Sequence, residues 1–277
     1  MEKKTILVLG ANGKTGSRVI ERLEKISDIE IRKGSRNEKV PFDWENPETW
    51  EPLLQGIDAV YITFQPDLAI PSAAETITKF TTLATKKGIQ KMVLLSGRGE
   101  KEAQVCEEIV KNNATNWTII RASWFNQNFS ENFFLEPILA GMVALPRAEA
   151  LEPFIDADDI ADVVVESLLN DNHNGKTYEL TGPELLTFEK AVTVIEKAAN
   201  RNITFQGLTL KEYIQMLKDY EIPDEDIWLI NYLFEEVLDG RNAHITSDIE
   251  KVLGRKPKDF ATYAEETAKL GVWNLNQ

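Results

Sequence analysis

The sequence predicts an α/β fold with a doubly wound parallel sheet, followed by a smaller, mostly helical C-terminal lobe. Short apolar segments alternate with segments of helical spacing through the first two thirds of the chain. The apolar segments are continuous runs, which are typical of parallel strands that helices cover on both faces. The alternation therefore indicates a parallel sheet whose ligand crevice lies beyond the carboxyl ends of its strands.

The individual elements follow from the same patterns. The expected strands are apolar runs at residues 5–9, 29–33, 58–63, 91–95 and 117–121. The helices between them are expected at residues 17–23, 47–55, 70–87 and 101–111. Beyond residue 121 we expect short strands at 152–155 and 178–181, and helices at 133–139 and 156–168. The remaining helices are expected at residues 188–199, 211–218, 224–238, 248–253 and 260–268.

These elements favour two lobes. At 277 residues the chain is long enough for one large domain or two coupled ones. We predict a nucleotide-binding domain over residues 1–183, in which residues 122–153 contribute to a substrate pocket. Residues 184–277 are then a smaller, helical, substrate-side lobe.

Three glycines, Gly10, Gly13 and Gly16, lie between the first strand and the first helix. Glycine suits a sharp turn that approaches a phosphate, and the following helix offers unpaired N–H groups and a partial positive charge. This order is that of the dinucleotide-binding fingerprint of Rossmann proteins, although the spacing is G-x-x-G-x-x-G in place of the commoner G-x-G-x-x-G. The turn predicts a nucleotide phosphate as ligand, the alternative being an ordinary strand–helix turn with chance glycines.

The end of the second strand indicates which dinucleotide is bound. Units that prefer NAD place Asp or Glu there to hold the ribose 2′-hydroxyl, whereas this strand is followed by Ser35 and Arg36. Arginine presents a fork of donors that suits the 2′-phosphate of NADP, and Ser35 and Lys14 could contact the same phosphate. The sequence therefore predicts NADP(H) over NAD(H), unless Arg36 is a solvated surface charge.

Composition restricts the partners and the compartment. The formal net charge of −14 disfavours direct binding to nucleic acid. No apolar run reaches the length of a membrane span, and the first strand begins too early for a signal peptide. A single cysteine, Cys106, fits a reducing compartment and is expected to be a buried structural residue. We expect a cytoplasmic protein without a metal site, because His173, His244 and one cysteine are too few ligands for zinc.

Two longer motifs are more specific than the glycine turn. They are Leu-Leu-Ser-Gly-Arg-Gly-Glu at residues 94–100 and Arg-Ala-Ser-Trp-Phe-Asn-Gln-Asn-Phe at residues 121–129. With them the chain resembles the NmrA-like family of atypical short-chain dehydrogenases/reductases, which includes regulators, quinone reductases and ergot-alkaloid-type dehydrogenases. The resemblance covers nearly the whole chain and extends over residues 10–16, 35–37, 42–44, 153–161, 178–183 and 253–257.

The resemblance implies a set of NAD(P)-binding residues. The pyrophosphate would be lined by Gly10, Asn12, Gly13 and Gly16, and Lys14 and Thr15 in the same turn would also contact the cofactor. The 2′-phosphate would lie at Ser35 and Arg36, and the adenine beside Asp43 and Trp44, although Trp44 fits an aromatic core equally well. The nicotinamide side would be lined by Thr63, Phe64, Gln65 and Ser96.

One expected feature of the wider dehydrogenase group is missing. Active members use a Tyr-x-x-x-Lys pair, in which the lysine lowers the pKa of the tyrosine so that it can exchange a proton with the substrate. Gly99 and Ala103 occupy these two positions here, and residues 99–106 contain no tyrosine. The usual proton-transfer pair is therefore absent from this sequence.

Hydride transfer to an electrophilic acceptor needs mainly proximity and orientation, so it does not require that pair. The residues that could position an acceptor or donate a hydrogen bond to it are Ser96, Lys101, Trp124, Asn126 and Gln127. Lys101 could instead be a solvated helix residue. Trp124 could form an aromatic wall with Phe125 and Phe129, or it could be core packing.

Two functions remain open at this point. The first is an NADP(H)-dependent reductase of a small quinone-like or imine-like acceptor, which the aromatic segment 124–129 would suit. The second is a redox sensor that binds NADP(H) or NADP⁺ and signals to a protein partner without catalysis. The sensor would present an apolar face of the C-terminal lobe, formed by Tyr213, Leu217, Ile227, Ile230 and Phe234.

Overall fold

The computed structural model describes residues 3–275, which divide into two compact units. Unit 1 contains the chain up to Ala122 together with Ala157–Leu180 and Asp248–Gly254. Unit 2 contains Ser123–Asp156, Thr181–Ser247 and the chain from Arg255 onward. The units interleave along the chain, in place of the single boundary after residue 183 that the sequence suggests. We describe each unit by itself.

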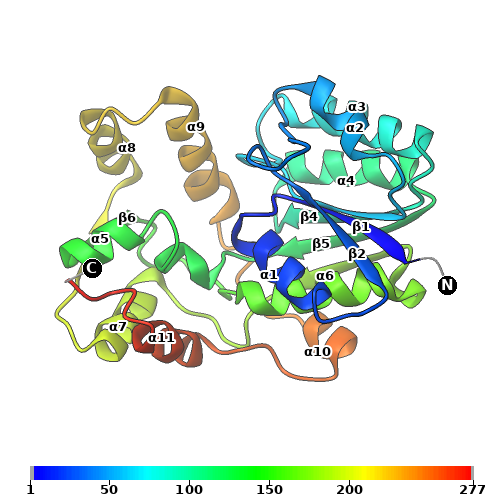
Figure 1. The fold of residues 1–277 in the computed structure, drawn as a ribbon. Coiled ribbons are helices and arrows are strands. Elements are labelled where there is room, and N and C mark those ends of the chain that lie inside the picture. Colours follow the sequence, from blue (N-terminus) through cyan, green and yellow to red (C-terminus); the bar gives the residue numbers. More distant parts are fainter. Residues whose placement is uncertain (1–2, 276–277) are drawn as a thin grey trace. The chain divides into compact units, whose positions relative to one another are not determined.

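Unit 1 is an α/β sandwich around a six-stranded parallel sheet, as the sequence predicts. The strands are β1 (Lys4–Leu9), β2 (Ile29–Gly34), β3 (Ala59–Ile62), β4 (Lys91–Gly97), β5 (Asn116–Ala122) and β7 (Lys176–Leu180) (Figure 1). The main helices are α1 (Lys14–Leu23), α3 (Ala73–Lys86), α4 (Lys101–Asn113), α6 (Ala157–Leu169) and α10 (Asp248–Leu253). The short helices are η1 (Pro47–Thr49), α2 (Trp50–Leu53) and η3 (Asp171–His173).

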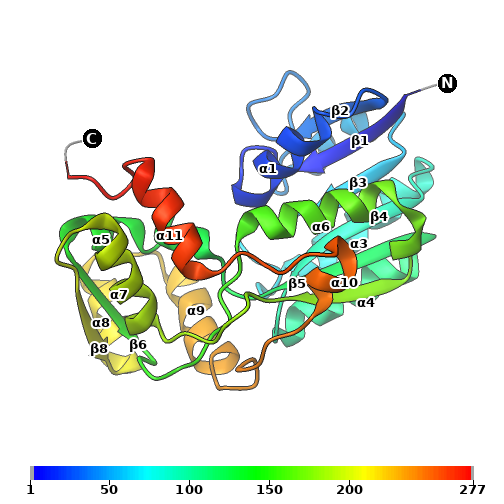
Figure 2. The same cartoon turned by 90° about the horizontal axis from the view of Figure 1, so that it is seen from below.

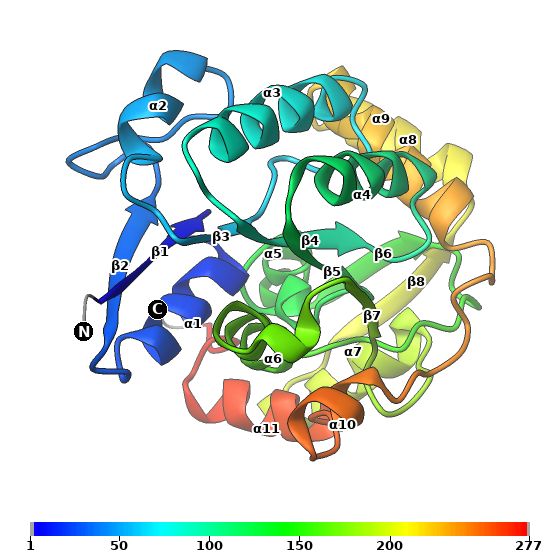
Figure 3. The same cartoon turned by 90° about the vertical axis from the view of Figure 1, so that its right-hand side faces the viewer.

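The sheet is covered on both faces, which explains its continuous apolar strands. Helices α3 and α4 lie side by side on one face, and α1 and α6 lie side by side on the other (Figure 3). Every residue of β3 is buried, as are the last four residues of β1. Such runs are expected where neither face of a strand meets water.

The strand order β2-β1-β3-β4-β5-β7 places the first connection on one side of β1 and the later ones on the other. The order of strands therefore reverses between β1 and β3. In doubly wound folds ligands bind at such a switch point, beyond the carboxyl ends of the strands. The glycine turn follows β1, so the topology places it at this point.

Helix α10 joins unit 1 although it comes late in the chain. It packs against α6 and β7, and the Asp248 carboxylate at its start accepts a hydrogen bond from the backbone N–H of Glu179 at 2.9 Å. The expected helix at residues 248–253 is thus confirmed, and it belongs to the sheet unit.

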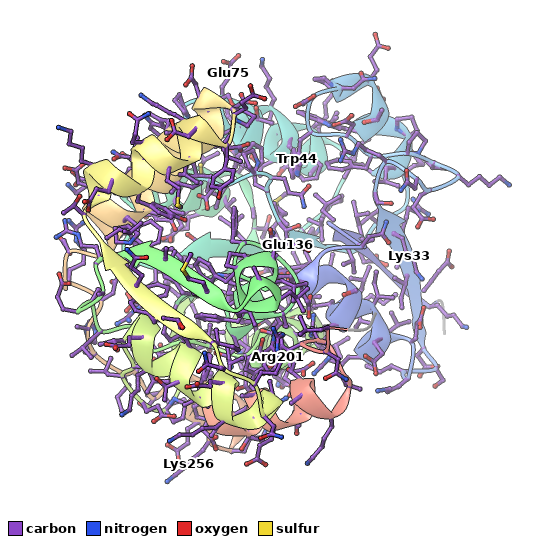
Figure 4. All side chains as sticks on the ribbon, turned by 90° about the vertical axis from the view of Figure 1, so that its left-hand side faces the viewer. Lys33, Trp44, Glu75, Glu136, Arg201 and Lys256 are labelled. Carbon is purple, nitrogen blue, oxygen red and sulfur yellow. The ribbon has the colours of Figure 1, made fainter. Side chains whose placement is uncertain are left out.

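Unit 2 is mostly helical around an aromatic core. Its elements are η2 (Asn126–Phe129), α5 (Leu135–Ala140), β6 (Met142–Pro146), α7 (Phe188–Ala199), β8 (Thr204–Leu208), α8 (Leu210–Asp219), α9 (Asp224–Tyr232), η4 (Leu233–Val237) and α11 (Phe260–Lys269). Helices α7 and α11 pack against each other (Figure 2). Arg201, labelled in Figure 4, donates hydrogen bonds to the backbone oxygens of Trp273 at 2.6 Å and Leu139 at 2.8 Å.

For unit 2, one strand pair was missed and two expectations were wrong. The parallel pair β6–β8 was not predicted, because its strands pair from segments far apart in the chain and half-exposed residues give no clear period. Residues 152–155 form no strand, only isolated bridges at Glu152 and Ile155. The apolar face expected for a partner is instead largely internal. Tyr213 and Phe234 belong to the core of unit 2, Leu217 and Ile230 pack against it, and Ile227 is buried.

Among the described helices, none combines the length and the apolar character that a membrane-spanning segment needs.

Candidate functional site

The glycine turn after β1 is closed by its own backbone and leaves no room for side chains. The N–H of Gly13 donates a hydrogen bond to the carbonyl oxygen of Gly10 at 2.8 Å. Gly10 has a φ of +63°, and a Cβ there would overlap the hydroxyl of Thr63. A Cβ on Gly16 would overlap the Gly10 carbonyl group, lying 2.7 Å from its carbon. Glycine is thus required both for the turn and for the close approach of α1 to it.

Helix α1 begins directly after this turn, and its N-terminus suits an anion. Gly13 is the N-cap residue, so no side chain caps the helix, and the first turn contains no acidic residue. The first backbone N–H groups of a helix lack intrahelical acceptors and carry the positive end of the macrodipole. A phosphate can be bound there by these groups and by Lys14.

Thr15 has a structural role in the same turn. Its side chain is buried and accepts a hydrogen bond from the Tyr61 hydroxyl at 3.0 Å. Burial raises the pKa of Tyr61, so this hydroxyl keeps its proton and remains the donor. If Thr15 contacts a phosphate, its backbone N–H is the available group.

The turn is also joined to the end of β2, where the sequence predicts the 2′-phosphate site. The backbone N–H of Ala11 donates to the Gly34 carbonyl at 3.2 Å, and the Asn12 amide donates to the Ser35 hydroxyl at 3.1 Å. Arg36, the next residue, is exposed, and within residues 3–275 its guanidinium has no hydrogen bond or ion pair. It can therefore turn toward a ligand without breaking an internal contact.

Trp44 is held in an aromatic cluster of unit 1, where Figure 4 labels it. Its indole N–H donates to the Thr63 carbonyl at 3.0 Å, and its ring packs edge-on against Phe42 and Phe80. Phe64 lies at 5.0 Å between ring centroids on the same indole. These contacts favour the core interpretation of Trp44.

Asp43 and the residues after β3 complete this part of the edge. The Asp43 carboxylate accepts a hydrogen bond from the backbone N–H of Glu45 at 3.1 Å, while its carbonyl accepts from the Trp50 indole at 2.7 Å. The Thr63 hydroxyl donates to the Leu9 carbonyl at 3.1 Å and so links the ends of β1 and β3. Gln65 is exposed at the same edge.

Ser96, at the end of β4, belongs to a buried charge network that the sequence did not predict. Its hydroxyl donates to Glu107 Oε1 at 2.8 Å, and Glu107 has no exposed surface. Arg121 on β5 holds the same carboxylate with two hydrogen bonds, of 2.8 and 2.7 Å, and bonds Glu179 on β7 at 3.2 Å. Arg98 pairs with Glu179 at 3.3 Å. The Ser96 hydroxyl is thus committed to positioning an internal carboxylate.

A second buried group at the end of β4 was also missed. Glu100 is 6% exposed, and its carboxyl group fills the space where a Cβ of Gly97 would lie. It is hydrogen-bonded to the carboxyl group of Asp67, in the segment after β3. Burial is the main cause that raises the pKa of each group, and for Glu100 the charge of Asp67 adds to it. No signal in the sequence could pair two carboxyl groups that lie on different loops.

Gly99 and Ala103, which occupy the positions of the missing tyrosine and lysine, have structural roles. Gly99 is in the left-handed region with a φ of +83°, and Ala103 is fully buried in the core of unit 1. Lys101 is exposed at the start of α4.

Cys106 is buried as predicted. Burial raises the pKa of its thiol to about 12, so it is not a reactive thiolate.

In unit 2 the predicted residues Trp124 and Asn126 have different surroundings. Trp124 packs against Phe188 and Phe234, each at 5.4 Å between ring centroids, which supports the core interpretation. Asn126 is completely buried, yet neither its amide nitrogen nor its oxygen has a partner among the described residues. An unpaired buried amide costs about 1–3 kcal/mol per group, and such groups call for a ligand or water. Asn126 is therefore the candidate ligand contact of unit 2.

Two family models match this chain. The model described as NAD(P)H-binding matches residues 10–171, and that of the NmrA-like family matches residues 100–265. Among curated relatives, Prestalk A differentiation protein A of Dictyostelium discoideum is 27% identical, covering 96% of this chain and 93% of its own length. The uncharacterized oxidoreductase YesF of Bacillus subtilis is 26% identical, with 95% of each chain covered. Festuclavine synthase I of Penicillium roqueforti is 28% identical, covering 94% and 97%.

Solved structures share the fold. An NADPH-dependent quinone oxidoreductase from Escherichia coli, complexed with NADPH, has a TM-score of 0.79 and 18% identity, covering 94% of this chain and 99% of its own. The triphenylmethane reductase of Citrobacter sp., complexed with NADP(H), has a TM-score of 0.78 and 16% identity, covering 95% and 99%. The negative transcriptional regulator NmrA, in complex with NADP, has a TM-score of 0.71 and 16% identity, covering 100% and 99%.

Proposed function

Because the chain belongs to the NAD(P)H-binding and NmrA-like families, we propose that it binds NADP(H) and reduces a small, electron-poor acceptor. The observation that carries the proposal is the glycine turn with the uncapped start of α1, in which the lack of a Cβ at Gly10 and Gly16 lets the turn close tightly against β3 and α1. The pyrophosphate would lie on the N–H groups of α1. The exposed Arg36 guanidinium supports the phosphorylated form of the cofactor.

The acceptor class follows from what the chain lacks and from its relatives. The bound cofactor would supply hydride, and no Tyr-x-x-x-Lys pair is present to exchange a proton at the expected positions. Acceptors such as quinones and iminium ions can take hydride when they are held close and well oriented. Relatives are named as a festuclavine synthase, an NADPH-dependent quinone oxidoreductase and a triphenylmethane reductase, and these names support a ring-containing acceptor here.

Asn126 is the residue that we propose to hydrogen-bond the acceptor. Its buried, unpartnered amide offers two donors and an acceptor group with no internal use. Trp124 would support Asn126 by packing, and we expect Lys101 to contribute less, because its side chain is exposed. Ser96 would act through Glu107, as a positioning residue.

The test is NADPH oxidation against a panel of quinones, iminium ions, azo compounds and aldehydes. We expect turnover with at least one electron-poor ring acceptor, and much weaker turnover with NADH. Asn126→Ala should lower kcat/KM while the Kd of NADPH stays unchanged, and the exposed Asn132→Ala is the matched control. Tight NADPH binding without turnover of any acceptor would refute the reductase.

A second candidate is a redox sensor without catalysis. It is favoured by Gly99 and Ala103 at the expected catalytic positions, and by the structural likeness to a transcriptional regulator. The buried apolar face of α8 and α9 removes the partner surface that was expected for it. Calorimetry with NADP⁺ and NADPH tests this role, since a ligand shifts an equilibrium only through differential binding. Equal affinities for the two forms would exclude it.

A further inference from the structure

The carboxyl groups of Glu100, which is buried, and Asp67, which is partly buried, form a pair at the edge where a dinucleotide would bind. Asp67 follows β3 and Glu100 follows β4, and these strands are neighbours that pair Ile62 with Leu94. The carboxyl ends of parallel strands lie at one edge of the sheet, so both groups lie on the side of the glycine turn.

The pair needs a proton to exist. Two carboxyl groups can hydrogen-bond to each other only when one of them is protonated. Glu100 Oε2 is buried and has no donor among the described residues. Below the pKa of the second ionisation the pair therefore carries one negative charge and one shared proton.

Among the described residues, the neighbouring charges that shift the pKa of Glu100 are all negative. The charged groups that act on Glu100 are Asp67, Glu102 and Glu107, and each raises its pKa. Glu107 is already held by Arg121. The thiol of Cys106, the other titratable group near Asp67, stays protonated. A ligand that brings a cation to this edge would therefore meet a carboxyl pair whose neighbouring charges are negative.

The topology indicates which ligand brings that cation. A dinucleotide has its pyrophosphate between two nucleosides. If the pyrophosphate lies on α1 and the 2′-phosphate lies at Arg36 after β2, the second nucleoside extends to the other side of β1, toward β3 and β4. In NADP⁺ this second nucleoside carries a positively charged nicotinamide ring, whereas in NADPH the ring is neutral.

We propose that the Asp67–Glu100 pair is the counter-charge for the oxidised nicotinamide ring, and that it releases its shared proton when NADP⁺ binds but not when NADPH binds. The inference rests on the proposed NADP(H) site. The affinity for NADP⁺ then depends on pH. Because binding releases one proton, the affinity rises by up to tenfold for each unit of pH increase within the titration range of the pair. This proton release also gives the chain a means to distinguish the two redox forms.

The experiment counts protons by calorimetry, with NADP⁺ and NADPH each titrated in buffers of different ionisation enthalpy. The 2′-phosphate titrates near pH 6 but is common to both forms, so its contribution cancels in the comparison. We expect proton release with NADP⁺ in excess of NADPH, and loss of this excess in Glu100→Gln and in Asp67→Asn. Glu108→Gln, exposed on the same helix, should keep it.

A second readout needs no cofactor. Because folding raises the pKa of both carboxyl groups, their contribution to stability is complete at low pH and is lost as pH rises through the folded pKa values. Thermal unfolding of the free protein should show this loss, and Glu100→Gln should flatten it. Equal proton release with both cofactor forms would overturn the inference and leave the NADP(H) site intact. Failure of both forms to bind would overturn the site and the inference together.

Discussion

The two halves of the carboxyl edge in unit 1 are built in different ways. At the ends of β1 and β2 the structure uses backbone groups. The backbone of Gly16 lies against the carbonyl group of Gly10, and no side chain caps the start of α1. At the ends of β4 and β5 it uses buried charge, with Glu107 and Arg121 joined by two hydrogen bonds. The first half is arranged to receive an anion, whereas the second consists of carboxylates and guanidinium groups that are paired with each other.

The largest expected effect lies in the charged half. Glu107→Gln removes a carboxylate that Arg121 holds in two places and leaves the guanidinium partly unpaired. Breaking a buried ion pair costs about 3–5 kcal/mol. We expect a value near the lower end, because Arg121 is 21% exposed and keeps Glu179. Denaturant unfolding measures this loss, with the exposed Glu108→Gln as control; equal stability of the two variants would show that the network has no energetic role.

The next largest effect is expected for cofactor binding in the anion-binding half. Arg36→Ala should weaken NADPH roughly ten- to a hundredfold, since a charge-assisted hydrogen bond contributes about 1.5–3 kcal/mol. NADH lacks the 2′-phosphate, so its affinity should change little. Fluorescence titration with both cofactors measures the ratio of the NADPH and NADH dissociation constants. Lys39 is an exposed cation in the same loop, and Lys39→Ala is the control. An unchanged NADPH affinity would place the 2′-phosphate elsewhere.

The close contacts of the glycines test the packing of the same anion-binding half. Gly16→Ala forces α1 away from the Gly10 carbonyl, and such overpacking typically costs about 1–3 kcal/mol. Gly13→Ala is the matched control, because its Cβ would meet the Gly10 oxygen at 3.2 Å and needs only a small shift. We expect Gly16→Ala to lose both thermal stability and NADPH affinity, and Gly13→Ala to lose much less of each. The reverse order would contradict the packing described for this turn.

The contrast also explains what the sequence could predict. The glycine turn, the strands and most helices are local patterns, so their positions were predicted within a few residues, and helix 188–199 was predicted without error. The charged network joins residues 14 and 58 positions apart on one helix and two strands, and no local pattern marks such partners. The pair β6–β8 escaped prediction for the same reason.

The smallest expected effect decides the role of Ser96. The sequence suggests a catalytic residue, whereas the structure commits its hydroxyl to Glu107 at 2.8 Å. Ser96→Ala should therefore cost about 1 kcal/mol of stability, as for one buried hydrogen bond, and leave kcat within about twofold. Unfolding and steady-state kinetics on the same preparation separate the two roles, and Ser96→Thr, which keeps the hydroxyl, should restore stability if the added methyl group fits. A tenfold fall in kcat with stability unchanged would instead show that Ser96 contacts the reacting groups, and that the charged half takes part in the chemistry directly.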